Sequence, residues 1–417
     1  MKRFINTIIL ATLVISCDDA LTLPPAASLF TESPEILEDK AIFRLATANM
    51  PDSSARVFPI VWGGDAEIGT DCAVSADAFV FGGESPVDSI VVTALRFGTG
   101  KTLSMTVELP EGTEGGKYLT ASYTLPEPLA HIGLNSGYRF LTDSTEIGFI
   151  LTDATGKAQA LKHNDVEIAL SVDKSKSTAS EGVDFAFSDS STFIIKPGEN
   201  KGSLKIKSLN PHPQAGKDKI VLNISYGDKF AGGEIQEMEI SLLDTLWNRA
   251  EGKWAADTLL TDSLYMENIW GELCSAYSLI PEPEEDDDID FDLEGCLFKP
   301  SFSSSFSDYF KGNSTIRKGA GIDLEVSEGE KVSLQTFTLS NTNRYFSSQE
   351  SSEDTESLIG MRILEGETSE TDTLDLYIID HTSRSFMPEL EKEGRYAPEK
   401  PVAASPGMFL NLRFTKQ

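Results

Sequence analysis

An internal repeat constrains the fold of this chain more than any other feature of its 417 residues. The segment 66–75, AEIGTDCAVS, returns 113 positions later as ASEGVDFAFS in residues 179–188. Glu84, in Gly-Gly-Glu, matches Glu199, in Pro-Gly-Glu. Around each copy the sequence predicts one strand before the motif and two after it: 57–62, 89–95 and 103–109, then 166–172, 203–209 and 220–224. Two tandem domains of the same type, each of about 100 residues, are therefore expected.

The hydrophobic pattern predicts that these domains are built from strands. Short apolar runs with a period of two are separated by Gly, Asp and Pro, and no segment keeps a helical period. We predict an all-β chain, with two immunoglobulin-like sandwiches at residues 40–126 and 137–244. A larger C-terminal β-sandwich or barrel is expected at residues 246–417, where apolar residues alternate again at 374–378 and 408–414.

The second copy of the motif resembles a Calx-β domain. It reads ASEGVDF over residues 179–185, then FIIKPGE over 193–199, then LKI over 204–206. The resemblance implies an immunoglobulin-like sandwich in which Asp184 caps a turn and Phe185 enters the core. Members of this family that bind calcium use acidic end loops. The corresponding stretch here, residues 210–219, holds two lysines and one aspartate, so calcium is not carried over to this copy.

The first residues are typical of an export signal. Lys2 and Arg3 precede a short apolar run, which is shorter than the roughly 20 apolar residues that a membrane span needs. The sequence Val-Ile-Ser-Cys over residues 14–17 resembles the lipobox of bacterial lipoproteins. This resemblance implies cleavage of residues 1–16 and lipidation, with palmitate among the acyl chains, at Cys17. Residues 17–39, which are rich in Pro, Ser and Ala, are predicted to form a tether.

Two further features resemble Bacteroidetes surface lipoproteins. Asp18 and Asp19 directly follow the lipidated position, as in the surface-export signal of that group. Tripeptides similar to its O-glycosylation sequon also recur, with acceptors at Ser89, Ser144, Thr245, Thr258, Ser263 and Thr373. Both features imply a lipid-anchored protein at the cell surface of the outer membrane.

The charge of the chain excludes some partners. The formal net charge is −31 at pH 7. Nucleic-acid binding depends on a basic face that displaces counterions, and none is visible in the sequence. Binding to anionic lipid is disfavoured for the same reason, so contact with the membrane is expected only through the lipid anchor. No motif for a cofactor is evident, and no His or Cys spacing indicates a catalytic metal.

The C-terminal domain opens with Gly252-Lys-Trp254, which is similar to the start of lipocalin-like barrels. Aromatic residues follow closely, and Trp254, Trp270 and Tyr277 are candidates for a platform on which a sugar ring stacks. The alternative is that these rings fill the core of the domain, as aromatic side chains usually do.

Cysteines and carboxylates suggest two further sites in the same domain. Cys274 and Cys296 flank an acidic segment, and a disulfide between them is possible in an oxidising compartment. Within that segment, Asp286, Asp288 and Asp290 alternate and offer a weak calcium site. The alternative is a solvated loop, which runs of like charge usually form.

These features favour a non-enzymatic surface lipoprotein that binds a glycan, a protein or the host matrix. The alternatives are a glycan-acting hydrolase with its site in residues 250–417, and an accessory glycan-binding subunit of a starch-utilisation-type uptake system. No catalytic residue stands out, because a chain this acidic supplies paired carboxylates everywhere.

Overall fold

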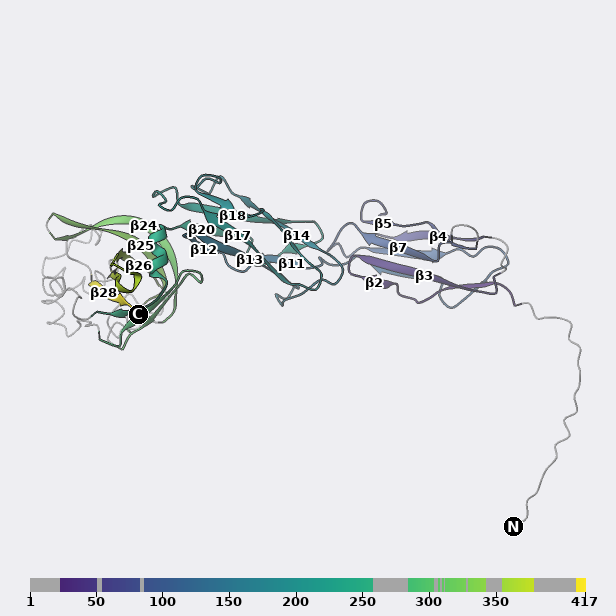
Figure 1. The fold of residues 1–417 in the computed structure, drawn as a ribbon. Helices are drawn as coiled ribbons and strands as arrows, with labels where there is room; N and C mark the ends of the chain where they lie inside the picture. Colours follow the sequence, from purple (N-terminus) through teal and green to yellow (C-terminus); the bar gives the residue numbers. More distant parts are fainter. Residues whose placement is uncertain are drawn as a thin grey trace, which may run out of the picture. The chain divides into compact units, whose positions relative to one another are not determined.

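The computed structural model describes residues 23–50, 55–82, 86–257, 284–303, 307, 310, 312–327, 329–342, 355–378 and 410–417. The chain forms two compact units, residues 1–129 and residues 130–417. Figure 1 shows that strands dominate both units. Within the described ranges, no helix has the length and apolar character needed to cross a membrane.

The first unit is a two-layer β-sandwich, called sandwich 1. One sheet has the order β5-β7-β3-β1-β9, with β2 also paired to β3, and the other has the order β10-β8-β4-β6. The inward residues of both sheets, among them Phe43, Phe58, Phe79 and Met105, form its core. The strands are β1 (Ala26–Leu29), β2 (Glu35–Leu37), β3 (Lys40–Ala48), β4 (Arg56–Gly64), β5 (Cys72–Val74), β6 (Ala78–Phe81), β7 (Ser89–Ala94), β8 (Thr102–Val107), β9 (Glu114–Gly115) and β10 (Thr120–Thr124).

The second unit begins with a sandwich of the same topology, called sandwich 2. Its sheets have the orders β15-β17-β13-β11-β19 and β12-β20-β18-β14-β16. Apart from β2 and β12, every strand of one sandwich has a counterpart in the other, which confirms the predicted pair of tandem immunoglobulin-like domains. The strands are β11 (His131–Leu134), β12 (Tyr138–Leu141), β13 (Ser144–Thr152), β14 (Val166–Val172), β15 (Phe185–Phe187), β16 (Thr192–Ile195), β17 (Lys201–Ser208), β18 (Lys219–Tyr226), β19 (Ala231–Gly232) and β20 (Glu237–Leu242).

The repeated motif forms the same turn in both sandwiches. The aspartate side chain accepts a hydrogen bond from the main-chain N–H four residues earlier, at 2.9 Å for Asp71 and 2.8 Å for Asp184. The next residue is fully buried in both copies, although it is Cys72 in one and Phe185 in the other. The motif therefore fixes a turn that returns the chain to the core, as the sequence predicts.

The C-terminal strands form a closed barrel, the second of the two predicted alternatives. In the described part of the chain, consecutive strands pair antiparallel and β21 pairs with β28, which closes the sheet. One apolar cluster takes residues from all eight strands and is therefore the barrel interior. The strands are β21 (Gly252–Ala256), β22 (Asp288–Asp292), β23 (Leu297–Ser301), β24 (Ser314–Ser327), β25 (Glu330–Thr342), β26 (Thr355–Leu364), β27 (Thr373–Ile378) and β28 (Leu410–Lys416).

Sandwich 2 and the barrel share this core. The 3₁₀ helix η1 (Thr245–Ala250) joins them, and its Trp247 ring packs edge-on against Phe337 of β25 at a centroid distance of 4.9 Å. Phe140 of β12 packs against the Phe337 ring as well, at a centroid distance of 6.1 Å, and Tyr138 belongs to the same apolar cluster. The second unit is compact because these aromatic side chains are buried jointly by both parts.

One position of the repeat carries opposite charges in the two sandwiches, and in sandwich 2 it adds a polar contact at this junction. In sandwich 1, Lys101 forms an ion pair with Asp71 at 2.6 Å. The equivalent residue of sandwich 2 is Asp218, which instead pairs with Lys318 of β24. The Lys318 ammonium also donates to the carbonyl of Leu242 at 2.6 Å, and only 9% of its side chain is exposed. Sandwich 2 therefore uses this position to contact the barrel.

Candidate functional site

The outer face of the β10-β8-β4-β6 sheet of sandwich 1, called the uncharged face, is the candidate site. Its position follows from the period of two, because alternate residues of each strand point to solvent. Val57 and Val61 are 49% and 51% exposed. The outward side chains are those of Val57, Pro59, Val61 and Gly63 on β4, Ala78 and Val80 on β6, Thr102, Ser104 and Thr106 on β8, and Thr120, Ser122 and Thr124 on β10.

None of these twelve outward residues is charged, although Asp and Glu make up 66 of the 417 residues. The equivalent face of sandwich 2 differs. It carries Glu167 on β14, Lys219 on β18, and Glu237 and Glu239 on β20. Lys219 and Glu239 pair there at 2.8 Å. The two domains share a topology, so the absence of charge in sandwich 1 does not follow from the fold.

The chemistry of the uncharged face suits contact with another macromolecule. Valine methyl groups on β4 and β6 supply apolar area, and the hydroxyl groups on β8 and β10 can donate and accept hydrogen bonds. Charged residues are depleted at the centres of protein interfaces, because each buried charge must be desolvated. The first charged residue that follows β8 is Glu108, directly after the end of the strand.

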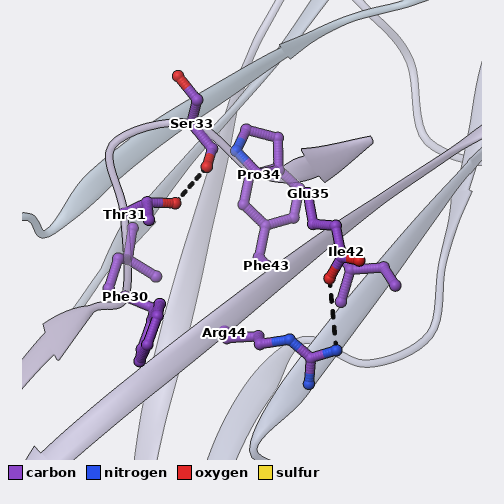
Figure 2. Close-up of a pocket in the computed structure, with 9 residues that line it drawn as sticks. Phe30, Thr31, Ser33, Pro34, Glu35, Ile42, Phe43 and Arg44 are labelled. Atoms are coloured by element: carbon purple, nitrogen blue, oxygen red, sulfur yellow. Dashed lines mark hydrogen bonds and ion pairs between the residues drawn. The ribbon is translucent and has the colours of Figure 1, made fainter. Parts of the chain in front are cut away.

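Sandwich 1 also contains a cavity of about 340 Å³ beside β3. Figure 2 shows Phe30 and Thr31 on one side of it, and Arg44 of β3 paired with Glu35 of β2 at 3.5 Å. Both partners of this ion pair are about half exposed, so the pair is worth less than about 1 kcal/mol. The cavity lies where β2 folds back onto β3, and its only charged lining groups already bind each other.

The proposed sugar platform is wrong for Trp254. The indole is fully buried in the barrel, and its N–H donates to the carbonyl of Ala250 at 2.8 Å. The ammonium of Lys416 lies 4.5 Å from the ring centroid and donates to the carbonyl of Arg249 at 2.7 Å. Trp254 therefore closes one end of the barrel core and cannot stack on a ligand. Trp270 and Tyr277 lie outside the described residues.

The carboxylates proposed for calcium do not converge. Asp286 is exposed in the turn before β22, whereas Asp288 and Asp290 belong to that strand and not to a loop. Each of these two pairs with a lysine, Asp288 with Lys253 at 2.7 Å and Asp290 with Lys299 at 3.4 Å. No group of three or more potential ligands occurs among the residues whose positions are described.

Cys296 is a free and buried cysteine among the described residues, and its bridge to Cys274 stays a prediction. Burial raises the pKa of its thiol to about 11, so it is protonated at neutral pH and unreactive. Its sulfur lies 4.0 Å from the carbonyl oxygen of Tyr138, at the junction with sandwich 2. Cys274 and the lipidation position Cys17 lie outside the described residues.

Sequence reasoning did not identify the uncharged face. A signal was present, because the outward positions of two strands read Thr-x-Ser-x-Thr, at 102–106 and again at 120–124. Their significance depends on knowing that β10 and β8 are neighbours, which the register Thr120↔Thr106 and Thr124↔Thr102 establishes.

Comparison with known protein families finds no matching family model, and no curated protein matches the chain. Solved structures with some likeness include CBD12 from CALX1.2, at 11% identity and a TM-score of 0.23, covering 52% of this chain and 100% of that one. The Yersinia pseudotuberculosis adhesin InvE matches at 13% identity and a TM-score of 0.24, covering 52% of this chain and 58% of the InvE chain. The Escherichia coli adhesin FdeC matches at 10% identity and a TM-score of 0.23, covering 76% of this chain and 90% of the FdeC chain. Scores this low carry no argument about function.

Proposed function

We propose that this protein is a cell-surface lipoprotein, anchored to the outer membrane through Cys17, that acts as a non-enzymatic binding or adhesion module. The observation that carries the proposal is the uncharged face of sandwich 1, with Val57 and Val61 about half exposed in a chain of net charge −31. An exposed apolar surface on an acidic protein is typical of an interaction site. Its partner is a protein, because a broad face of methyl and hydroxyl groups offers no pocket for a small charged ligand.

The test uses the chain from residue 18 to residue 417 on an array of matrix proteins, surface proteins and glycans. Val61→Arg places a charge at the centre of the uncharged face, and the affinity for a protein partner should fall by at least about tenfold. Val183→Arg is the matched control, because Val183 is 67% exposed and belongs to sandwich 2, not to the uncharged face. Equal binding by both variants would contradict the assignment. Binding to glycans alone, or hydrolysis of a glycan, would favour the alternatives.

The anchor is tested separately. Cys17→Ala should abolish incorporation of labelled palmitate in the producing bacterium and leave the N-terminal segment uncleaved, because the thiol is the acyl acceptor. Labelling that survives the substitution would refute the lipoprotein assignment and leave the binding assignment untouched.

A further inference from the structure

One end of the barrel, called the barrel mouth, holds a cavity of about 490 Å³. On β25, Phe337 and Leu339 belong to the barrel core. Gln335 and Ser333 lie two and four positions before Phe337, so they continue the same face of the strand toward the hairpin with β24. Asp323 of β24 lies directly opposite Ser333 and shares this face. The cavity is therefore the outward extension of the barrel interior.

Apolar side chains form one part of this cavity. Leu246 and Trp247 of η1 line it together with Met361 and Ile363 of β26. Trp247, Met361 and Ile363 also belong to the barrel core. Small-molecule sites often lie in the mouths of β-barrels, with volumes of roughly 300–1,000 Å³ and mostly apolar linings that carry a few polar groups. The barrel mouth has this composition.

Asp323, Ser333 and Gln335 supply the polar groups and are called the acceptor wall. The Ser333 hydroxyl donates to the carboxylate of Asp323 at 2.7 Å. The Gln335 amide donates to the carbonyls of Gly319 and Thr336, at 2.8 Å and 3.0 Å. Every side-chain donor of the acceptor wall is therefore in use, and the groups that it offers to a ligand are oxygen acceptors.

The charge of the barrel mouth favours a cation. Asp323 is exposed and forms no ion pair with another described residue, including Lys331 on the same face of β25. Arg362 also lines the cavity, but it follows Met361 and so its side chain lies on the outer face of β26. There its guanidinium binds the carboxylate of Asp375, at 2.8 Å and 2.9 Å. The carboxylate of Asp323 is therefore the charge that a ligand in the mouth would meet.

We infer that the barrel mouth binds an alkylammonium cation. An ammonium group has three donors and no acceptor, so it matches the acceptor wall around Asp323. Its alkyl chain covers the apolar side chains of Leu246 and Trp247. A carboxylate or phosphate group would be repelled by Asp323 and would find no free donor in the acceptor wall. The net charge of −31 also raises the local concentration of cations.

Calorimetric titration of the chain from residue 18 to residue 417, at pH 7 and about 0.15 M salt, tests the site. The probes are hexylammonium, hexanol and hexanoate, which share one alkyl chain and differ in the charge of the head group. Hexylammonium should bind with a Kd of about 1 mM, and the other two probes at least about tenfold more weakly. Hexanol or hexanoate that binds as tightly as hexylammonium, or no hexylammonium binding at about 10 mM, would overturn the proposal.

Three variants separate this site from general attraction of cations. Asp323→Asn keeps the shape of the side chain and removes its charge, so the Kd for hexylammonium should rise about tenfold. Asp286→Asn is the matched control, because Asp286 is exposed and does not line the cavity. Ser333→Lys places an ammonium group beside Asp323 and should abolish binding with little change in Tm, since Ser333 is exposed. Equal effects of the two aspartate substitutions would contradict the assignment.

Two sources share the chemistry of the ligand, a lysine side chain of a protein and a free amine. Nα-acetyl-lysine methylamide distinguishes them: a Kd within about threefold of that of hexylammonium identifies the lysine side chain, and much weaker binding identifies the free amine. Either result supports the site. Val61→Arg should leave hexylammonium binding unchanged, because Val61 belongs to sandwich 1 and not to the barrel. The test is thus independent of the binding function proposed above.

Discussion

Phe337→Ala is the most informative perturbation of this protein, because Phe337 lies where sandwich 2 meets the barrel. Its ring is fully buried and packs against Trp247 at 4.9 Å and against Phe140 and Phe291 at 6.1 Å. Truncation of a fully buried phenylalanine costs about 3–5 kcal/mol. At about 2–4 °C per kcal/mol for a unit of this size, the Tm of the second unit should fall by roughly 10 °C.

Scanning calorimetry measures the shift, and the transition of sandwich 1 serves as the internal control because Phe337 is not part of its core. Hydrogen exchange shows which strands respond. If the shared core holds sandwich 2 and the barrel together, amides of β18 and β26 should lose protection in parallel. Loss of protection in β26 alone, or a cost below about 1 kcal/mol, would refute the argument that the two parts are stabilised jointly.

Two further predictions concern the repeated motif. Phe185→Ala should destabilise the second unit by about 3–5 kcal/mol in denaturant unfolding, because the side chain is fully buried; a loss below about 0.5 kcal/mol would show that the motif is misinterpreted. A hydrogen bond from Lys101 lowers the pKa of Asp71, so its ionised form stabilises the fold above pH of about 4. Asp71→Asn should therefore lower Tm most at pH 7 and progressively less as the pH falls through the folded-state pKa; a constant difference would contradict this.

The sequence alone determined most of the strands and the two repeated domains. Local patterns suffice for this, because alternating apolar residues stabilise a strand wherever one face is buried, and the turn around Asp184 is closed by residues within five positions of each other. The position of Phe185 in the core follows from the same local geometry. The Gly-x-Trp opening at Trp254 also indicated a barrel as one of two alternatives. The predicted tether over residues 17–39 is wrong for β1 and β2, which belong to sandwich 1 because they pair with β3.

Only the tertiary structure decided which of the predicted side chains are accessible. The sequence around Trp254 does not distinguish a tryptophan that stacks on a ligand from one that fills a core. The pairing of β21 with β28 closes the barrel and buries this side chain. The uncharged face depends on the pairing of β10 with β8. These features arise from contacts between residues distant in sequence, so no local pattern could specify them.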